Sequence, residues 1–189
     1  ATNGFDESGS NNPSLFTYWN ENTTTANSWI AATSTNVALL AGVPYRMLVR
    51  GDRTVDQRYN NSPSTVTTLR VYGNAKTGDV TKTNLTTTSG RYVFVGNPYQ
   101  APINLQTTLA ASTGFNTNFY NIWDATINTR GAYVVHNFAT GLNSNGSSAA
   151  NRYIQPGQAF FIQTNATTQS LNFKEDQKYL STTTAHVFK

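Results

Sequence analysis

The sequence predicts an all-β protein, an antiparallel β-sandwich or jelly-roll-like fold built from two related halves. Its 189 residues include ten Tyr, ten Phe and three Trp, and only 12% of them are charged. Aromatic and β-branched residues favour strands, whereas Asn, Ser and Gly favour turns. Short apolar runs separated by polar turns are typical of antiparallel sheets, which bury one apolar face by packing in layers. The large aromatic content excludes a disordered chain.

Two stretches of the chain resemble each other. Tyr18-Trp19-Asn20 precedes the segment 42–49, and Ile122-Trp123-Asp124 precedes the segment 156–163. Each copy reads Trp-Asx, then a Gly/Pro turn, then an aromatic-rich strand, and a further apolar strand follows in both halves. The pattern indicates one supersecondary unit used twice, and two units too small to fold alone would share one core.

The repeat suggests the domain organisation. We expect a single β-sandwich module over residues 15–189, with half-repeats at about 15–90 and 91–180. Residues 1–14 form a lead-in segment whose order the sequence leaves open. A chain of this length suits one domain with a sizeable core.

Period-two alternation gives the individual strands. Over 45–50 it places Tyr45, Met47 and Val49 on one face and Arg46, Leu48 and Arg50 on the other. Further strands are predicted at 66–72, 91–96, 120–123, 132–136, 159–164 and 170–173, with turns at Asn74, Gly78-Asp79, Gly90 and Gly141. A short helix is predicted over 103–111.

The segment 95–103 reads as a strand that ends in a rigid corner. Gly96 permits close backbone approach, and Asn97 before Pro98 favours an extended or turn conformation. Pro98 and Pro102 keep the following segment out of any β ladder, since proline lacks an N–H donor.

Five short motifs, in this order, resemble one family. They are Tyr45-Arg46-Met47-Leu48-Val49-Arg50-Gly51-Asp52-Arg53, Thr77-Gly78-Asp79-Val80, Gly96-Asn97-Pro98-Tyr99, Ile122-Trp123-Asp124 and Pro156-Gly157-Gln158-Ala159-Phe160-Phe161. In them the chain is similar to the β-rich module found near the C-terminus of large secreted proteins of Bacteroidota, upstream of a type IX secretion sorting domain. The resemblance covers about residues 15–189.

The resemblance implies export across the outer membrane, and hence an extracellular location or display on the outer cell surface. It implies no enzyme. The predicted function is therefore a noncatalytic module that acts in adhesion or as a structural spacer. Its partners would be a surface polysaccharide or protein ligand and the neighbouring domains of the parent chain.

Aromatic side chains are the first candidates for ligand contact, because exposed rings with polar rims mark binding surfaces. Trp29 has no counterpart in the second half of the chain and is the leading candidate, and Tyr59 and Tyr153 lie in polar, Asn-rich segments. For Trp19 and Trp123, which occupy matching positions in the repeat, packing in the core is the favoured interpretation.

Two arginines are the second set of candidates. Between residues 46 and 91 eight basic residues face three acidic ones, a local net charge of +5. Arg46 and Arg50 project from one face of a predicted strand, where guanidinium groups suit the carboxylate, sulfate or uronate groups of an acidic polysaccharide. A solvated charged face is the alternative.

A rival function is a carbohydrate-binding module of a secreted polysaccharide-degrading enzyme. Coplanar exposed aromatic rings on one face would favour this rival, whereas burial of all three Trp would favour the scaffold. An enzyme would need two acids facing each other in a cleft, and the chain has no Gly-x-Ser-x-Gly motif and only two histidines.

Composition and motifs exclude other classes. The chain has no cysteine, no His-rich metal spacing and no EF-hand loop, so no cofactor is predicted. Ca²⁺ bound by Glu175-Asp176, Asp52 or Asp56 is an unsupported alternative. No nucleic-acid motif is found, and the longest apolar run is far shorter than the ~20 residues that a membrane helix needs. Arg50-Gly51-Asp52 matches a receptor-binding tripeptide, but turn geometry explains its glycine better.

Overall fold

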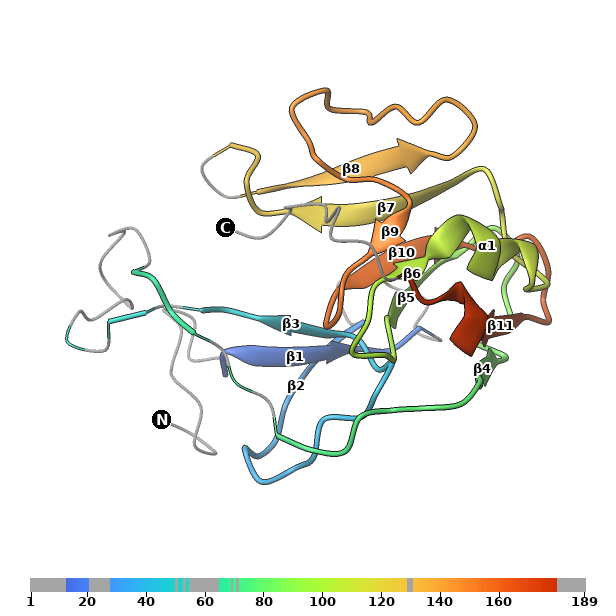
Figure 1. Cartoon of the computed structure of the whole chain (residues 1–189). Coiled ribbons are helices and arrows are strands. Elements are labelled where there is room, and N and C mark those ends of the chain that lie inside the picture. Colours follow the sequence, from blue (N-terminus) through green and yellow to red (C-terminus); the bar gives the residue numbers. More distant parts are fainter. Residues whose placement is uncertain are drawn as a thin grey trace. The chain divides into compact units, whose positions relative to one another are not determined.

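The computed structural model describes residues 13–20, 28–49, 51–52, 54, 65–68, 70, 72–128 and 131–179. These residues form antiparallel sheets, one short α-helix and a single-turn 3-10 helix, Glu175–Gln177 (Figure 1). The chain divides into an N-terminal unit, Ala1–Leu40 with Tyr45–Asn74, and a C-terminal unit, Ala41–Pro44 with Ala75–Lys189. The prediction of a β protein with antiparallel sheets is confirmed.

The N-terminal unit contains a three-stranded sheet of order β2-β1-β3. Its strands are β1 (Leu15–Tyr18), β2 (Trp29–Ala31) and β3 (Tyr45–Met47). Both outer strands run antiparallel to β1, and the pairs Tyr18↔Trp29 and Phe16↔Arg46 set the register. Trp29 on β2 and Arg46 on β3 are therefore brought onto the same face of this sheet, together with Tyr18 and Phe16 of β1.

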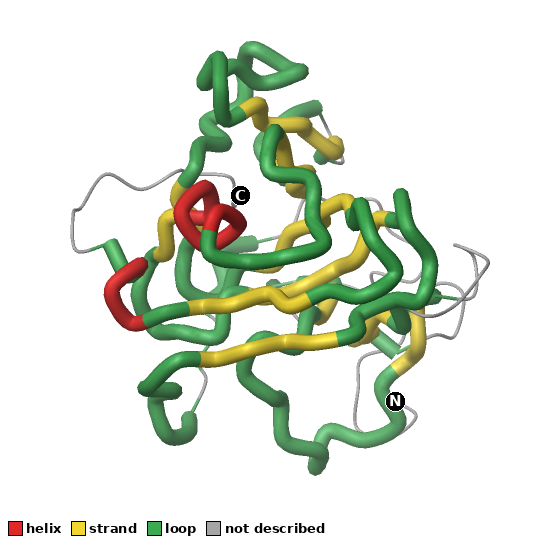
Figure 2. Tube along the Cα trace, turned by 90° about the vertical axis from the view of Figure 1, so that its right-hand side faces the viewer, coloured by secondary structure: helices red, strands yellow, loops and turns green. Residues whose placement is uncertain are grey.

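A four-stranded sheet of order β5-β10-β7-β8 is the main element of the C-terminal unit. Its strands are β5 (Tyr92–Gly96), β7 (Phe119–Asp124), β8 (Ala132–Asn137) and β10 (Ala159–Gln163). Two smaller antiparallel pairs are β4 (Val80–Thr83) with β11 (Ser170–Phe173) and β6 (Ile103–Asn104) with β9 (Tyr153–Ile154). Between the short strands the trace is mostly loop (Figure 2).

The core of the C-terminal unit lies against one face of this sheet. Alternate residues of the four strands, among them Val93, Phe160 and Ile162, are fully buried there. They join apolar side chains from the other elements, namely Ile103, Leu105, Leu109, Phe115, Ile154, Leu171 and Phe173. The intervening residues of each strand point to the opposite face, as period-two geometry requires.

The helix α1 (Leu105–Ala110) is shorter than the predicted helix over 103–111. Asn104 is its N-cap, and its side chain accepts a hydrogen bond from the Thr107 N–H. The two preceding residues pair with β9 instead. Because the N-cap residue Asn104 also ends the paired strand β6, the helix begins at Leu105 and not at residue 103.

The predicted end of the strand and corner after β5 are confirmed, but the expectation that the prolines keep the following segment out of any ladder is wrong, because Ile103-Asn104, directly after Pro102, pairs with β9. The buried amide of Asn97 donates to the carbonyls of Ala101 (2.9 Å), Gln155 (3.1 Å) and Ile154 (3.2 Å). Its Oδ1 accepts from the Tyr99 N–H at 3.0 Å. The Asn97 side chain thus provides hydrogen-bond partners for three carbonyls and one N–H group, in a segment where proline cannot donate a backbone hydrogen bond.

Strands predicted in the C-terminal unit are confirmed at β5, β7, β8, β10 and β11, within one or two residues at each end. The strand predicted over 66–72 is wrong, because none of the described residues 65–68, 70 and 72 is in a strand, and Val66 and Tyr72 are exposed. The strand predicted over 45–50 ends at Met47. Its last predicted residue, Arg50, lies outside the described residues.

Candidate ligand-binding site

The candidate site is on one face of the β2-β1-β3 sheet. Side chains of directly paired residues share a face, so the two registers place Trp29, Tyr18, Phe16 and Arg46 on the same side. Two residues that the sequence singles out separately, Trp29 and Arg46, thereby meet. We call this group the Arg46 cluster.

Arg46 lies over two aromatic rings in the Arg46 cluster. Its guanidinium carbon is 4.2 Å from the centre of the Trp29 ring and 4.9 Å from that of Phe16. Tyr18 meets Trp29 edge-on, with ring centroids 5.0 Å apart. Cation–π contacts of this kind hold an arginine in place while leaving N–H donors for another partner.

The charge of Arg46 has no acidic partner among the residues that the structure describes. Arg46 is exposed and Trp29 is half-buried. A planar cation held over an indole ring suits a ligand that carries both an anionic group and an apolar surface. An acidic saccharide has both.

The other candidates from the sequence do not join this group among the described residues. Tyr153 lies in strand β9 of the C-terminal unit, not in a loop, and stacks on Tyr179 with ring centroids 4.0 Å apart. A hydrogen bond with Tyr179 raises the pKa of the Tyr153 hydroxyl. Tyr59 and Arg50 lie outside the described residues.

Turn geometry explains the described part of the Arg50-Gly51-Asp52 tripeptide. Gly51 has a φ of +87°, and a Cβ there would lie 2.1 Å from the Thr65 hydroxyl oxygen. The Asp52 carboxylate accepts hydrogen bonds from the N–H and hydroxyl of Thr54, which lower its pKa. The glycine is therefore required by the backbone.

The expectation that Trp19 and Trp123 pack in the core is wrong. Trp19, just after β1, is 51% exposed, and Trp123, in β7, is 46% exposed. Alternation in β7 sends Ile122 into the core and turns Trp123 outward. At both of these positions the ring is exposed rather than buried.

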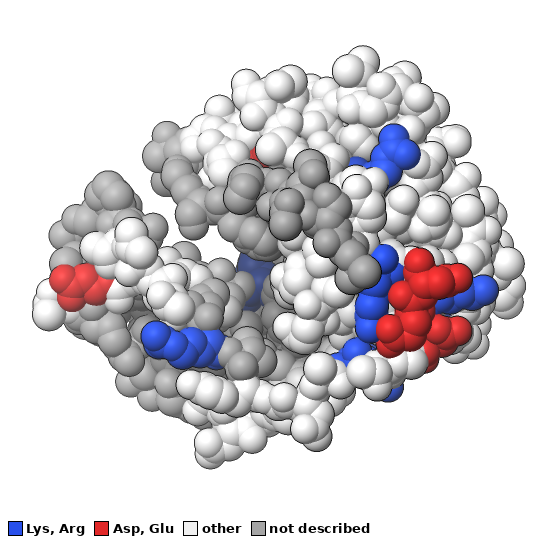
Figure 3. Space-filling view, in the orientation of Figure 1, with Lys and Arg blue, Asp and Glu red and all other residues white. Residues whose placement is uncertain are grey.

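Charged side chains gather at the β4–β11 end of the C-terminal unit (Figure 3). Glu175 pairs with Lys178 and accepts from the Gly78 N–H, and these two contacts lower the pKa of its carboxyl. Asp79 accepts from the Glu175 N–H. Within the described ranges no group of three His, Cys, Asp or Glu side chains is placed to hold a metal ion.

His136 is a buried histidine that faces the core from β8. Asn143 donates its amide to the carbonyls of Ser148 and Ala150, so its Oδ1 is an acceptor for His136 Nδ1 at 2.8 Å. Nδ1 therefore carries the proton of the neutral ring. The other nitrogen, Nε2, is buried and has no hydrogen-bond partner among the described residues.

This arrangement predicts a pH-dependent stability. Burial lowers the pKa of His136, the Asn143 bond opposes that shift, and the nearby charge of Arg152 adds to it. Because the unfolded chain binds the proton at a higher pH than the folded chain, stability should fall as pH drops below about 6.5. We expect the urea midpoint of the wild type to decrease between pH 7.5 and 5.5, and that of His136→Gln to change less. Equal slopes for both proteins would contradict this.

Comparison of the chain with protein-family models, curated proteins and solved structures finds no match. Within the residues that the structure describes, no helix has the length and apolar character needed to cross a membrane.

Proposed function

We propose that the chain is a noncatalytic module of an exported bacterial surface protein and acts in adhesion. The observation that carries the proposal is the Arg46 cluster, in which an exposed cation without an acidic partner among the described residues is held against aromatic rings. Export by a type IX system and an outer-surface location follow from the resemblance in the five sequence motifs. The adhesive role is chosen over a passive spacer because a spacer needs no such cluster.

The ligand chemistry that suits the Arg46 cluster is an anionic polysaccharide. A guanidinium binds a carboxylate or sulfate through two parallel hydrogen bonds, and the aromatic rings beside it offer apolar contact to a sugar ring. Nothing in this mechanism requires a bond to be made or broken. The affinity would depend on salt, since exposed charge pairs are screened.

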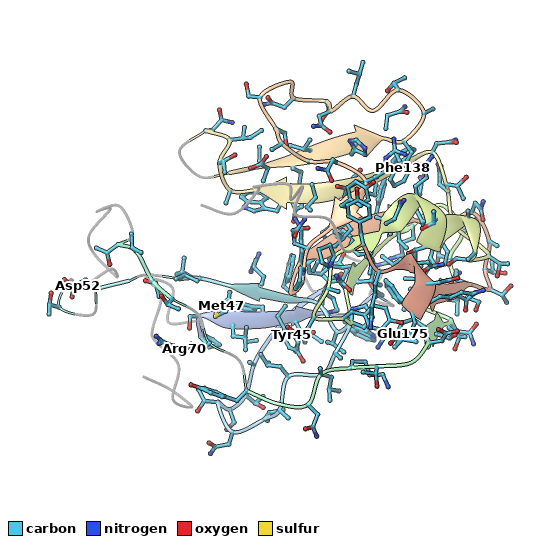
Figure 4. All side chains as sticks on the ribbon, in the orientation of Figure 1. Tyr45, Met47, Asp52, Arg70, Phe138 and Glu175 are labelled. Carbon is cyan, nitrogen blue, oxygen red and sulfur yellow. The ribbon has the colours of Figure 1, made fainter. Side chains whose placement is uncertain are left out.

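Arg46→Ala tests the proposal. We expect the full chain to bind soluble polygalacturonate, and the substitution to weaken binding about tenfold, which corresponds to about 1.4 kcal/mol. The measurement is isothermal titration calorimetry at low and at physiological salt. Arg70→Ala is the matched control because Arg70, labelled in Figure 4, is an exposed arginine of the same unit. If both variants weakened binding equally, the loss of affinity would be explained by the lower net charge of the protein. That result would contradict a specific site at Arg46.

A second candidate function is a carbohydrate-binding module of a secreted polysaccharide-degrading enzyme. It is kept because Trp19 and Trp123 are exposed, against the burial of all three Trp expected for a scaffold, although the exposed neighbours Trp123 and Tyr133 stand at 78° to each other and are not coplanar. Its ligand would be the substrate of the attached enzyme. Binding to insoluble plant or algal polysaccharide, with no binding to bacterial or host surface glycans, would favour this candidate over adhesion.

We also propose that the fold is a β-sandwich or jelly-roll-like module of two related halves. In each half the strand that carries or precedes the repeated Trp pairs antiparallel with the strand after the Gly/Pro turn, β1 with β3 and β7 with β10. In the first half Leu15 pairs with Met47. In the repeat, Phe119 corresponds to Leu15 and Phe161 corresponds to Met47. Phe161 pairs with Asn121, so the register of the second half is shifted by two residues. An even shift keeps the same side chains on each face.

A further inference from the structure

The outer face of the four-stranded sheet, away from the core, carries a row of aromatic side chains. Phe94 and Phe161 stack with centroids 4.3 Å apart, and Tyr133 meets Phe161 edge-on at 5.8 Å. Trp123 meets Tyr133 edge-on at 4.9 Å. The row therefore crosses from β5 through β10 to β7 and β8, and ends at Trp123 and Tyr133.

Its end is open to solvent. Trp123 is 46% exposed and Tyr133 is 54% exposed, whereas Phe94 is buried and Phe161 half-buried. The two exposed rings stand at 78° to each other. They form a right-angled corner in which one ring can lie under a bound ring and the other can contact its edge.

The backbone fixes the Trp123 ring in place. Gly131 has a φ of +84°, and a Cβ at this position would lie 2.7 Å from three atoms of the indole. The ring thus rests directly against a glycine backbone that no other residue could replace without displacing it. A ring held in this way loses little conformational entropy when it binds a ligand.

The outward positions of the four strands, all of them described, carry no charged side chain. The outward positions of the four strands are Tyr92, Phe94, Phe119, Asn121, Trp123, Tyr133, Val135, Asn137, Ala159, Phe161 and Gln163. Three of these side chains are amides, which can donate and accept hydrogen bonds. Asn121, two residues from Trp123 on the same face, has a buried Oδ1 without a hydrogen-bond partner among the described residues.

We propose that Trp123 and Tyr133 form a binding site for the pyranose units of a neutral polysaccharide. The apolar C–H face of a pyranose matches the indole face, and its hydroxyls match the amide groups beside it. Charged side chains on these strands would favour an anionic ligand, and the described outward positions have none, which favours a neutral one. A protein partner fits less well, because stable protein interfaces bury about 800 Å² per partner and only two rings of this row are well exposed.

This site is distinct from the Arg46 cluster in location and in ligand. It lies in the C-terminal unit, and its predicted ligand is uncharged. If polygalacturonate does not bind, the proposal for the Trp123 site still stands. If the neutral oligosaccharides do not bind, the proposal for the Arg46 cluster still stands. The two proposals are therefore tested by separate probes.

The test is titration of the full chain with cellohexaose, mannohexaose and xylohexaose, followed by calorimetry and tryptophan fluorescence. We expect saturable binding of at least one of the three, weakened tenfold or more by Trp123→Ala and less by Trp123→Phe, which keeps a ring. A blue shift of the fluorescence on binding should disappear in Trp123→Phe. Circular dichroism checks that both variants are folded.

Trp19→Ala is the matched control. Trp19 has similar exposure and the matching place in the sequence repeat, but it makes no ring contact within the described ranges. It should leave the affinity within twofold of the wild type. Absence of binding by all three oligosaccharides at millimolar concentration, or equal loss in Trp19→Ala and Trp123→Ala, would overturn the proposal.

Discussion

Replacing Phe160 by Ala should destabilise the C-terminal unit by about 4 kcal/mol, the range measured for deleting a large buried aromatic side chain. Phe160 is fully buried in the central strand β10 and meets Tyr120 edge-on, with centroids 6.2 Å apart. Its loss leaves a cavity that strands on both sides of β10 keep from collapsing. Urea denaturation monitored by circular dichroism measures the change.

The neighbouring substitution Phe161→Ala provides the comparison. It removes the same side chain from the same strand, but from the outer face, where Phe161 is half-buried. We expect a loss of about 2 kcal/mol there, because less apolar area returns to water. A loss as large as that of Phe160→Ala would mean that both faces of the sheet are core, and would contradict the outer-face position of the aromatic row.

Asn97→Ala should destabilise the same unit by about 3 kcal/mol, since each buried polar group left without a partner costs about 1–3 kcal/mol. The Asn97 side chain bonds the Ala101 carbonyl and the Tyr99 N–H within the corner, and also the carbonyls of Ile154 and Gln155 at the end of β9. Alanine cannot replace any of these bonds, and the site is too enclosed for bulk water to do so. The urea midpoint and the slope of the transition measure the effect.

Asn118→Ala is the control for this substitution. Asn118 is exposed, and the hydrogen bonds recorded for it use its backbone only. Its removal should change the stability by less than about 0.5 kcal/mol, as is usual for surface positions. If Asn97→Ala were equally mild, the three carbonyls would have to find other donors, and the corner would not depend on this side chain.

The stability of the corner and of the core matters for the proposed Trp123 site, which lies in the same unit. The Trp123 ring is placed by the register of β7 with β8 and by the backbone at Gly131. Both depend on the same four-stranded sheet that Phe160 supports from within. Destabilised variants should therefore lose oligosaccharide affinity only when the sheet unfolds, whereas Trp123→Ala should lose it in a folded protein.

Several elements were predictable because their signals are local. Alternation of apolar residues along β5, β7, β8 and β10 gave these strands, and Asn97-Pro98 gave the corner. The same alternation over 66–72 predicted a strand that the described residues there do not form. A strand exists only if a neighbour supplies its hydrogen bonds, and residues 66–72 alone cannot specify one.

The candidate residues were partly predictable, and their grouping was not. The sequence by itself singled out Trp29 and Arg46 as candidate ligand-binding residues in a β-rich chain. It also placed Trp123 in a sequence motif that occurs twice, and glycines at the turns. Only the tertiary structure decided that Arg46 lies over Trp29, because that contact depends on the pairing of β1 with two strands far away in the chain. It likewise decided that Ile122 is buried and Trp123 exposed, since period-two alternation separates two faces but the packing of the sheet chooses which one meets the core.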